Sequence, residues 1–443
     1  MNGVFYSRPA LSGQNPGDRM EYVSVSRLKS GMVLSGDLIA PNGRFILPKG
    51  ARLTPKNIMS LKIWGVSEVP VAKAKEPEEP GGDDLLYSSA VMEEARKMVL
   101  DLFSGIPPAS SLMEEVFTVA VRVSAGRIAE GLPAKSPETF TLSLPVKPRI
   151  SDEKIDMEDI LRTEVGLSSF PDVYFRVSEA LQSPKSSVSH IADLISKDTA
   201  LSAILLKLAN SAIYGVPGRV DSISRATALI GGRALSLLAL GVSAIQNFKD
   251  IPVEWVNMES FWKHSVSVAV IAQILASKKN PRIIEQAFVA GMLHDIGRLV
   301  LFRHAPFTMA RLITAAAERR APLTIIEKEV LGFDHGELGG KLLERWNFPL
   351  SLSDMVLQSH ETEEQVKDFP SALLAASDVL AAAIGEGNSG SLHASPIPDS
   401  VWKVVDLPCS VIDMTARQAH RQISEIYSLF KGGDDDGKTV PHS

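Results

Sequence analysis

Apolar and polar residues follow two different patterns along the chain. Between residues 21 and 72, short apolar stretches alternate with Gly, Pro and Asn, which is typical of strands and turns. Strands are predicted at Tyr22–Val25, Met32–Leu38, Arg44–Leu47 and Glu68–Val71. Asn42-Gly43 predicts a tight turn, and Thr54 before Pro55 predicts the start of a short helix. This part of the chain should form a small β-rich module.

Beyond this module, apolar residues recur at intervals of three and four, which predicts helices. Two amphipathic helices around 88–103 and 113–128 should form a connector. After residue 155 the helices follow one another closely, and strand signals are nearly absent. Expected helices include Val188–Ala209, Ser224–Val242, Glu259–Ser277, Ile283–Phe302 and Ala305–Arg319. Because these segments are apolar around most of their circumference and rich in small residues, they should pack closely in an all-α domain.

Pro, Gly and charged residues mark the expected boundaries between these parts. The predicted organisation is a disordered leader (1–20), the β-rich module (21–72), a charged linker (73–84), the helical connector (85–131), a Pro-rich linker (132–154), the helical domain (155–430) and a disordered tail (431–443). The fold class is therefore mainly α, with a small β-rich module ahead of a large helical domain.

Composition narrows the classes of function. The chain carries 46 Lys and Arg against 52 Asp and Glu, a formal charge of −6, so it lacks the basic excess that supports binding to nucleic acids. The single cysteine, Cys409, excludes an internal disulfide and a cysteine-based zinc cluster, and it suits a reducing cytoplasm. No apolar run is long enough to span a membrane, so we expect no membrane partner.

Histidine and aspartate residues gather in the helical domain. His294 and Asp295 are adjacent, and on a helix their side chains would point about 100° apart and could reach a common point. Imidazole nitrogen and carboxylate oxygen suit a divalent transition metal. Further donors are available at His264, His335, His360 and Asp378. Each histidine also has a structural interpretation as a hydrogen-bonded core residue, and Asp334 with Glu337 fits a variant capping box at a helix start.

The order of these residues, H…HD…H…H…D, lies within longer phrases that resemble a known family. These phrases include FPDVYFRVSEAL, IADLISKDTALSAILLKLANSAIYG, SISRATALIGGRALSLLALGV, AFVAGMLHDIGRLVLF and HGELGGKLLERWNFP. They resemble the HDOD domain, a relative of the HD-GYP signalling domains in the HD superfamily of metal-dependent phosphohydrolases, over about residues 167–380. The module at 21–72 is similar to a small domain often found before HD-GYP domains.

The resemblance implies an HD-type helical bundle and assigns roles to its polar residues. The implied ligands of a divalent metal are His264, His294, Asp295, His335, His360 and Asp378. Asp295 would bridge metals or support the attacking water, and Arg298 would bind phosphate where active HD-GYP proteins usually have Lys. Two departures argue against hydrolysis of cyclic dinucleotides: Ser359 replaces a histidine of the HHE motif, and the GYP segment is absent.

A second family hallmark precedes the histidines. It comprises Asn210, Ser211, Tyr214 and Gly215 within NSAIYG, and no chemistry is agreed for it. Its physical interpretation is a turn between two helices, because Asn can bind backbone groups at a helix end and Gly can adopt a positive φ.

Three functions are consistent with these observations. The first is a bacterial signal-transduction protein whose degenerate HD-type domain binds other signalling proteins, with no required cofactor. The second is a metal-dependent phosphohydrolase acting on a nucleotide or cyclic dinucleotide, with Asp295 as the catalytic residue. The third is a ligand-binding regulator that keeps the metal site for structure. The apolar faces of Val91–Phe103 and Met113–Ile128 would also suit a homodimer.

Overall fold

The chain divides into two compact units, residues 1–88 and 89–443. The computed structural model describes residues 20–24, 28, 32–35, 38–39, 45–47, 51, 53, 57, 61, 68–72, 87–131, 155–167, 170–183, 186–211, 214, 218–248, 251–252, 255–360 and 368–431. The leader, both linkers, the tail, the Asn42-Gly43 turn and the Thr54-Pro55 helix start lie largely or wholly outside these residues. The predictions made for those segments stay predictions.

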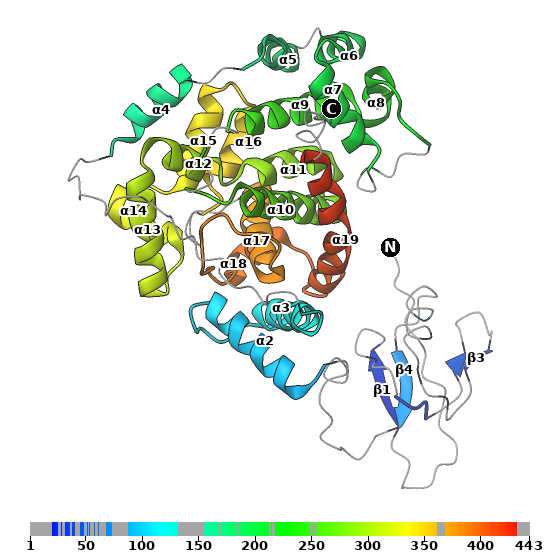
Figure 1. Ribbon diagram of the computed structural model, residues 1–443. Helices are drawn as coiled ribbons and strands as arrows, with labels where there is room; N and C mark the ends of the chain where they lie inside the picture. The colour runs from blue at the N-terminus through cyan, green and yellow to red at the C-terminus, as the bar shows by residue number, and fades with distance from the viewer. Residues whose placement is uncertain are drawn as a thin grey trace, which may run out of the picture. The chain divides into compact units, whose positions relative to one another are not determined.

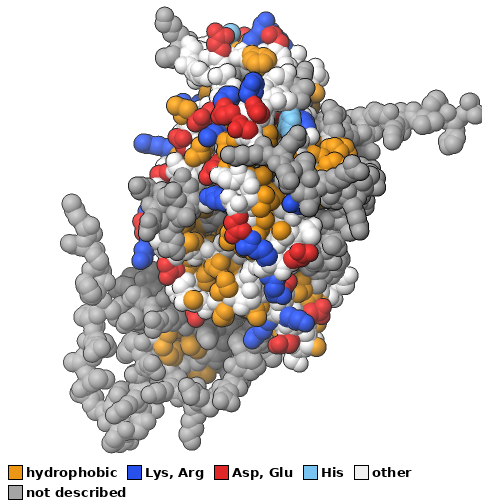
Figure 2. Space-filling view, turned by 90° about the vertical axis from the view of Figure 1, so that its left-hand side faces the viewer, with side chains coloured by type: hydrophobic (Ala, Val, Ile, Leu, Met, Phe, Trp, Pro, Cys, Tyr) orange, Lys and Arg blue, Asp and Glu red, His pale blue; other side chains and the backbone are white. Residues whose placement is uncertain are grey.

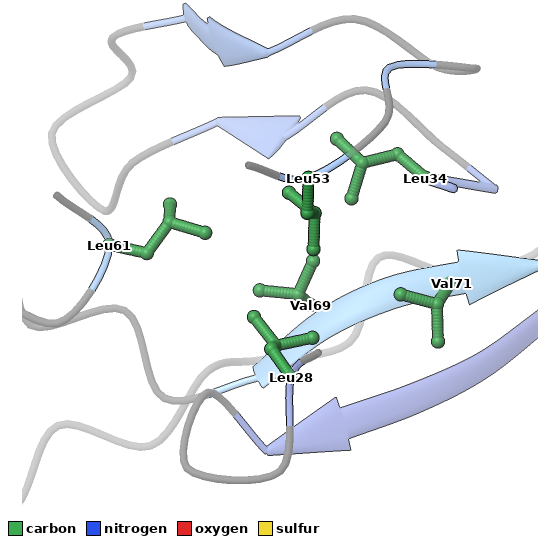
Figure 3. Close-up of a cluster of buried hydrophobic side chains, with 6 residues drawn as sticks. All are labelled: Leu28, Leu34, Leu53, Leu61, Val69 and Val71. Carbon is green, nitrogen blue, oxygen red and sulfur yellow. The ribbon is translucent and has the colours of Figure 1, made fainter. Parts of the chain in front are cut away.

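The first unit contains short antiparallel strands around a small apolar core. Strand β1 (Met20–Ser24) pairs with β4 (Glu68–Ala72), and β2 (Leu38–Ile39) pairs with β3 (Phe45–Leu47). The stretch predicted as one strand over Met32–Leu38 instead gives an isolated bridge between Leu34 and Val71, separate from β2. The core side chains in Figure 3 are Leu28, Leu34, Leu53, Leu61, Val69 and Val71.

Among its described residues, the second unit forms helices and connecting segments but no strand. Its elements are α2 (Ser89–Leu102), α3 (Ser111–Ala129), α4 (Met157–Leu167), α5 (Asp172–Gln182), α6 (Val188–Ser196), α7 (Thr199–Ala209), α8 (Ile223–Ile230), α9 (Gly232–Gln246), α10 (Met258–Lys279), η2 (Pro281–Ile283), α11 (Ile284–Leu293), α12 (Ile296–His304), α13 (Pro306–Arg319), α14 (Leu323–Leu331), α15 (His335–Arg345), α16 (Leu350–Leu357), α17 (Phe369–Ile384), α18 (Asp399–Val405) and α19 (Val411–Lys431). The expectation of a mainly helical fold is confirmed.

Helices α10 and α11 form the centre of this unit (Figure 1). Helix α10 is buried on all sides from His264 to Ala276, which fits its apolar and small-residue composition. A Cβ on Gly291 of α11 would lie 2.5 Å from the Cα of Ala269, so only glycine permits this approach of the two helices. A similar contact joins α12 to α15, where a Cβ on Gly297 would lie 2.0 Å from the carbonyl oxygen of His335.

Three segments predicted as single helices are broken in the structure. Asp198 caps α7 through its side chain, which accepts a hydrogen bond from Leu201 N, and so separates α6 from α7. Gly231 separates α8 from α9, which meet at 117°. The third break falls at His294 and Asp295, between α11 and α12. The expectation that this pair lies within one helix is therefore wrong.

The predicted helical connector, α2 and α3, packs against other helices of the second unit. Helix α3 contacts α2, α17 and α19, so residues from 89 onward belong to the same compact unit as the helical domain. Arg122 of α3 forms an ion pair with Asp413 of α19. The buried carboxylate of Glu386 lies 3.9 Å from Arg127 of α3 and 2.8 Å from Lys263 of α10. The apolar faces proposed for a homodimer are thus covered, in large part, within the chain.

The described surface carries charges of both signs. On the face in Figure 2, Lys and Arg side chains lie interspersed with Asp and Glu side chains and with scattered apolar ones. Among the described residues, no single helix has both the length and the apolar character needed to cross a membrane. Helices α8 and α9 have the required length and apolar character only when taken together, across the bend of 117° between them.

Candidate metal centre

Six histidine and aspartate side chains from five parts of the helical unit lie close together. His264 comes from α10, His294 and Asp295 from the junction of α11 and α12, His335 from the start of α15, His360 from the end of α16, and Asp378 from α17. These are the six residues named from the sequence. The structure brings all of them together, although their role as metal ligands stays a prediction.

The junction between α11 and α12 aims two of these side chains inward. The His294 ring is fully buried, and its Nδ1 lies 2.8 Å from the carbonyl oxygen of Gly291 in the last turn of α11. Its Nε2 lies 3.0 Å from Asp295 Oδ2 and 3.6 Å from Asp378 Oδ1. Because α11 ends at this point, the two consecutive side chains turn toward the same space.

Two groups of donor atoms share the Asp295 carboxylate. One group is His264, His294 and Asp295, and the other is Asp295, His335 and His360; within each group the donor atoms lie within 4.8 Å of one another. Asp378 adds to the first group, with its Oδ1 3.1 Å from His264 Nε2. In the second group, Asp295 Oδ1 lies 2.9 Å from His335 Nε2. The centre therefore offers two adjacent positions for a cation.

The electrostatics of the metal-free centre follow from burial opposed by close charges. Burial alone would lower the pKa of His294, but Asp295 and Asp378 raise it to about 10. Burial and Arg298 oppose protonation of His335, but Glu327 and Asp295 raise its pKa to about 9. Burial would raise the pKa of the Asp295 carboxyl, but Arg298 and His294 hold it well below its ordinary value.

His360 behaves in the opposite way. Burial lowers the pKa of this ring to about 4, and the nearby charge of His335 contributes to the shift. Near neutral pH, His360 is therefore neutral, whereas His294 and His335 are protonated. With Arg298 included, three positive charges then face the carboxylates of Asp295, Asp378 and Glu327, so the metal-free centre is balanced in charge.

The donor set fits a divalent transition metal. The Gly291 carbonyl can only accept, so His294 Nδ1 carries a proton and a neutral ring would turn its Nε2 lone pair toward two carboxylates. Within the described part of the chain, the Nε2 atoms of His294, His335 and His360 are buried without a hydrogen-bond partner. Acceptors that face one another in this way require a proton or a cation between them, and mixed imidazole and carboxylate ligands suit a transition metal.

Glu327 of α14 completes the centre and was not found from the sequence. Its fully buried carboxylate accepts hydrogen bonds from His335 Nδ1 at 2.6 Å and His335 N at 3.0 Å. A carboxylate behind a histidine fixes which ring nitrogen remains free to bind metal. The available signal was its position on the buried face of its helix, beside Leu323 and Ile326, where a charged residue needs a partner.

Replacing Glu327 with Gln should lower the affinity for Mn²⁺ by about 10- to 100-fold, because His335 would lose the carboxylate that orients it. Isothermal titration calorimetry would measure this change. Glu329→Gln is the matched control, since Glu329 lies on the same helix but is exposed and pairs with Arg319. Equal affinity in the two variants would contradict the role given to Glu327.

Arg298 and Ser359 depart from the ligand pattern. Arg298 is buried, and its guanidinium donates to Asp295 Oδ2 at 3.2 Å and to the Ser389 hydroxyl, which the sequence analysis did not single out. Ser359, which replaces a histidine of the related motif, donates its hydroxyl proton to the Val356 carbonyl at 2.7 Å. The hydroxyl proton of Ser359 is therefore already bound by a backbone carbonyl. Arg298 places a positive charge beside Asp295, the carboxylate that the two donor groups share.

A cavity of about 430 Å³ opens beside the centre. His264, Arg298, His360 and Asp378 line it on the inner side, while residues from α2, α14, α17 and the segment 387–401 form the rest of its wall. The Asp378 side chain is 22% exposed, more than the other carboxylates of the centre. The cavity thus connects the donor atoms with the surroundings of the domain.

The hallmark segment is built separately from this centre. The Asn210 side chain donates to the Leu206 and Val220 carbonyls, both at 2.7 Å, and accepts from Val220 N at 2.8 Å. Ser211 donates to the Leu208 carbonyl. Asn210, Ser211 and Tyr214 are not among the cavity lining, while Gly215 lies outside the described residues. These contacts support the interpretation of the segment as a turn between α7 and α8.

Three bacterial proteins are among the solved structures that resemble this chain. A candidate phosphohydrolase from Shewanella amazonensis SB2B is 24% identical, with a TM-score of 0.49 over 62% of this chain and 99% of the other. An HDOD domain protein of unknown function from Geobacter sulfurreducens is also 24% identical, with a TM-score of 0.43 over 62% and 98%. A candidate signal transduction protein from Marinobacter aquaeolei VT8 is 20% identical, with a TM-score of 0.46 over 65% and 68%.

Sequence comparison matches part of the helical unit. A curated protein from Treponema pallidum (strain Nichols), described as uncharacterized, is 27% identical over 204 residues. This region is 46% of our chain and 39% of the relative, so the match spans about two fifths of the relative's length. The sequence profile of the HDOD domain matches residues 167–362, which include His264, His294, Asp295, His335 and His360. This segment of the chain is an HDOD domain.

Proposed function

We propose that this chain is a signal-transduction protein. Its HDOD domain binds one divalent transition metal, and its interaction with another signalling protein depends on whether a ligand is bound. The observation that carries this proposal is the composition of the centre. Its histidines and carboxylates converge as a metal site requires, yet Arg298 lies 3.2 Å from Asp295 Oδ2, the oxygen that also faces His294. A guanidinium at the shared carboxylate competes with a second cation there.

Charge balance favours one bound ion. A divalent ion in either donor group displaces the proton of one ring, His294 or His335, and so adds one net positive charge to the centre. A second ion in the other group would displace the remaining proton and add a further positive charge that the described carboxylates of the centre do not balance. The metal would supply Lewis-acid chemistry to an anion in the cavity. The protein would hold that anion with Arg298 and exclude water with the apolar part of the cavity wall.

Hydrolysis of a phosphate ester is the second candidate. It is favoured by the two donor groups that share Asp295, because a shared carboxylate is suited to holding two metals. Against rapid turnover stand the hydroxyl of Ser359, which is committed to the Val356 carbonyl, and the positive charge of Arg298. These two features favour binding of a ligand over its conversion.

Metal content and turnover together test the proposal. We expect the purified protein to bind close to one Mn²⁺ or Zn²⁺ per chain and to show no measurable turnover of bis(p-nitrophenyl) phosphate. Metal-dependent turnover that is lost in a folded Asp295→Asn protein would favour the hydrolase. Failure to bind metal, with no change of stability on adding a chelator, would contradict the proposed metal role.

Metal binding should release a proton and strengthen with pH. Between pH 6 and 8 the metal-free rings of His294 and His335 are protonated, since their pKa values are about 10 and 9. The single metal binds one of these rings, and only in its deprotonated form, so its affinity should rise by up to about 10-fold per pH unit as one proton leaves. Calorimetry in buffers of different ionisation enthalpy would count the protons released, with the exposed His190→Gln variant as the control. A count near zero would contradict the assignment of either ring as a ligand.

A further inference from the structure

The cavity beside the metal centre has a charged inner end. The guanidinium of Arg298 lies at this end and is 4% exposed. Its Nε makes no hydrogen bond among the described residues but lies 3.8 Å from Glu327 Oε1. Lys328 also lines the cavity, with its Nζ 3.0 Å from Asp334. Asp378 is the one acidic residue among the described cavity lining. Arg and Lys beside a metal favour an anion, and a guanidinium can hold a phosphate through two parallel hydrogen bonds.

Part of the cavity wall is aliphatic. It is formed by Leu102 of α2, Ile325 of α14, Val379 of α17, and Ile397 and Val401 in and before α18. Ile325 is 45% exposed, so a ligand in the cavity would cover apolar surface that the protein itself leaves open. The aromatic rings among the described lining residues are those of His264, His360 and His393, none of which belongs to this aliphatic part of the wall, and there is no Phe, Tyr or Trp. Proteins commonly bind nucleobases by stacking them on aromatic rings, so this wall suits an aliphatic group better than a base.

Much of this wall lies outside the segment matched by the HDOD profile. The matched segment ends at residue 362, whereas α2 precedes it and the segment 387–401 follows it. These two parts hold each other in place: Ala394 N donates to the Leu102 carbonyl at 2.9 Å, and the His393 ring contacts the Asp101 carbonyl at 2.8 Å. The charged end of the cavity is therefore set mainly by the HDOD segment, and its aliphatic wall largely by additional parts of this chain.

From this arrangement we infer that the cavity binds a phosphate monoester with an aliphatic, non-aromatic body. The phosphate lies at Arg298 and the metal, and the body lies against Ile325 and Leu102. The inference rests on the proposed function, for which it names the class of ligand that the domain senses.

Calorimetric titration with hexyl phosphate, inorganic phosphate and AMP tests this inference in the full chain, with and without Mn²⁺. Hexyl phosphate should bind at least about 10-fold more tightly than inorganic phosphate, because its chain buries apolar surface. AMP should gain no comparable advantage over inorganic phosphate. Ile325→Ser should weaken the binding of hexyl phosphate by about 5-fold or more and leave that of inorganic phosphate unchanged.

Val330→Ser is the matched control, since Val330 lies on the same helix, is 58% exposed and does not line the cavity. It should leave all three affinities unchanged. Equal binding of hexyl phosphate and inorganic phosphate in both metal states, stronger binding of AMP than of hexyl phosphate, or an effect of Ile325→Ser matched by Val330→Ser would overturn the inference. Failure of Mn²⁺ to bind would contradict the proposed metal role alone, because the comparison of ligands without metal still decides the ligand class.

Discussion

The Asp295→Asn protein is expected to bind divalent metal at least about 100-fold more weakly than the wild type and to lose about 3–5 kcal/mol of folding stability without metal. Asp295 belongs to both donor groups, so its replacement affects each of them. Its carboxylate also faces His294, His335 and Arg298. Removing this negative charge leaves buried positive charges without a balancing partner, which is a costly change in a protein interior.

Urea unfolding in the presence of a chelator would measure the loss of stability, and calorimetry at a urea-free, native condition would measure metal binding. Asp354→Asn is the control, because Asp354 is exposed on α16 and belongs to neither donor group. If Asp295→Asn retained wild-type metal affinity, the shared carboxylate could not be a ligand. If the metal-free variant were as stable as the wild type, the charge balance described for the centre would be wrong.

Gly297→Ala should also strongly destabilise the fold. The added Cβ would lie 2.0 Å from the carbonyl oxygen of His335 and 2.9 Å from its carbonyl carbon. These are backbone atoms, so no side chain can rotate away, and α12 and α15 must separate. We expect a loss of more than about 3 kcal/mol, at or beyond the upper end of the usual cost of overpacking, or failure to fold.

Gly166→Ala provides a matched comparison. Gly166 also lies in a helix, but a Cβ there would have no heavy atom within 4 Å, so the substitution should stabilise the protein by up to about 1 kcal/mol. Thermal unfolding followed by circular dichroism would separate the two outcomes. Similar melting temperatures for both variants would show that α12 and α15 do not approach as closely as described.

The candidate centre could be located from the sequence because the order H…HD…H…H…D lies within phrases that resemble the HDOD domain. His294, Asp295 and Asp378 lie in apolar segments, where buried polar groups need partners. Glu327 escaped notice because the single sequence contains many glutamates, and only the fold places this one behind His335. Ser389 was missed for a similar reason, since its partner Arg298 is distant in sequence and no local pattern links the two.

The sequence predicted the presence of helices better than it predicted where they begin and end. Apolar residues continue at helical spacing on both sides of His294 and Asp295. Periodicity therefore gives no sign that the helix breaks between Leu293 and Ile296. That break depends on the polar contacts of His294 and Asp295, which come from other helices. The packing of α3 was hidden likewise, because its apolar face predicts a contact surface but does not identify the partner.

The ion pairs that α3 forms with Glu386 and with Asp413 limit how far the chain can be shortened from its N-terminal side. A fragment that begins at residue 155 would lack Arg127 and Arg122, and the faces of α17 and α19 that α3 covers would be open to solvent. Such a fragment should be prone to self-association, even though it contains all six donor residues and the whole matched domain. The shortest piece that we expect to stay monodisperse therefore starts at Ser89.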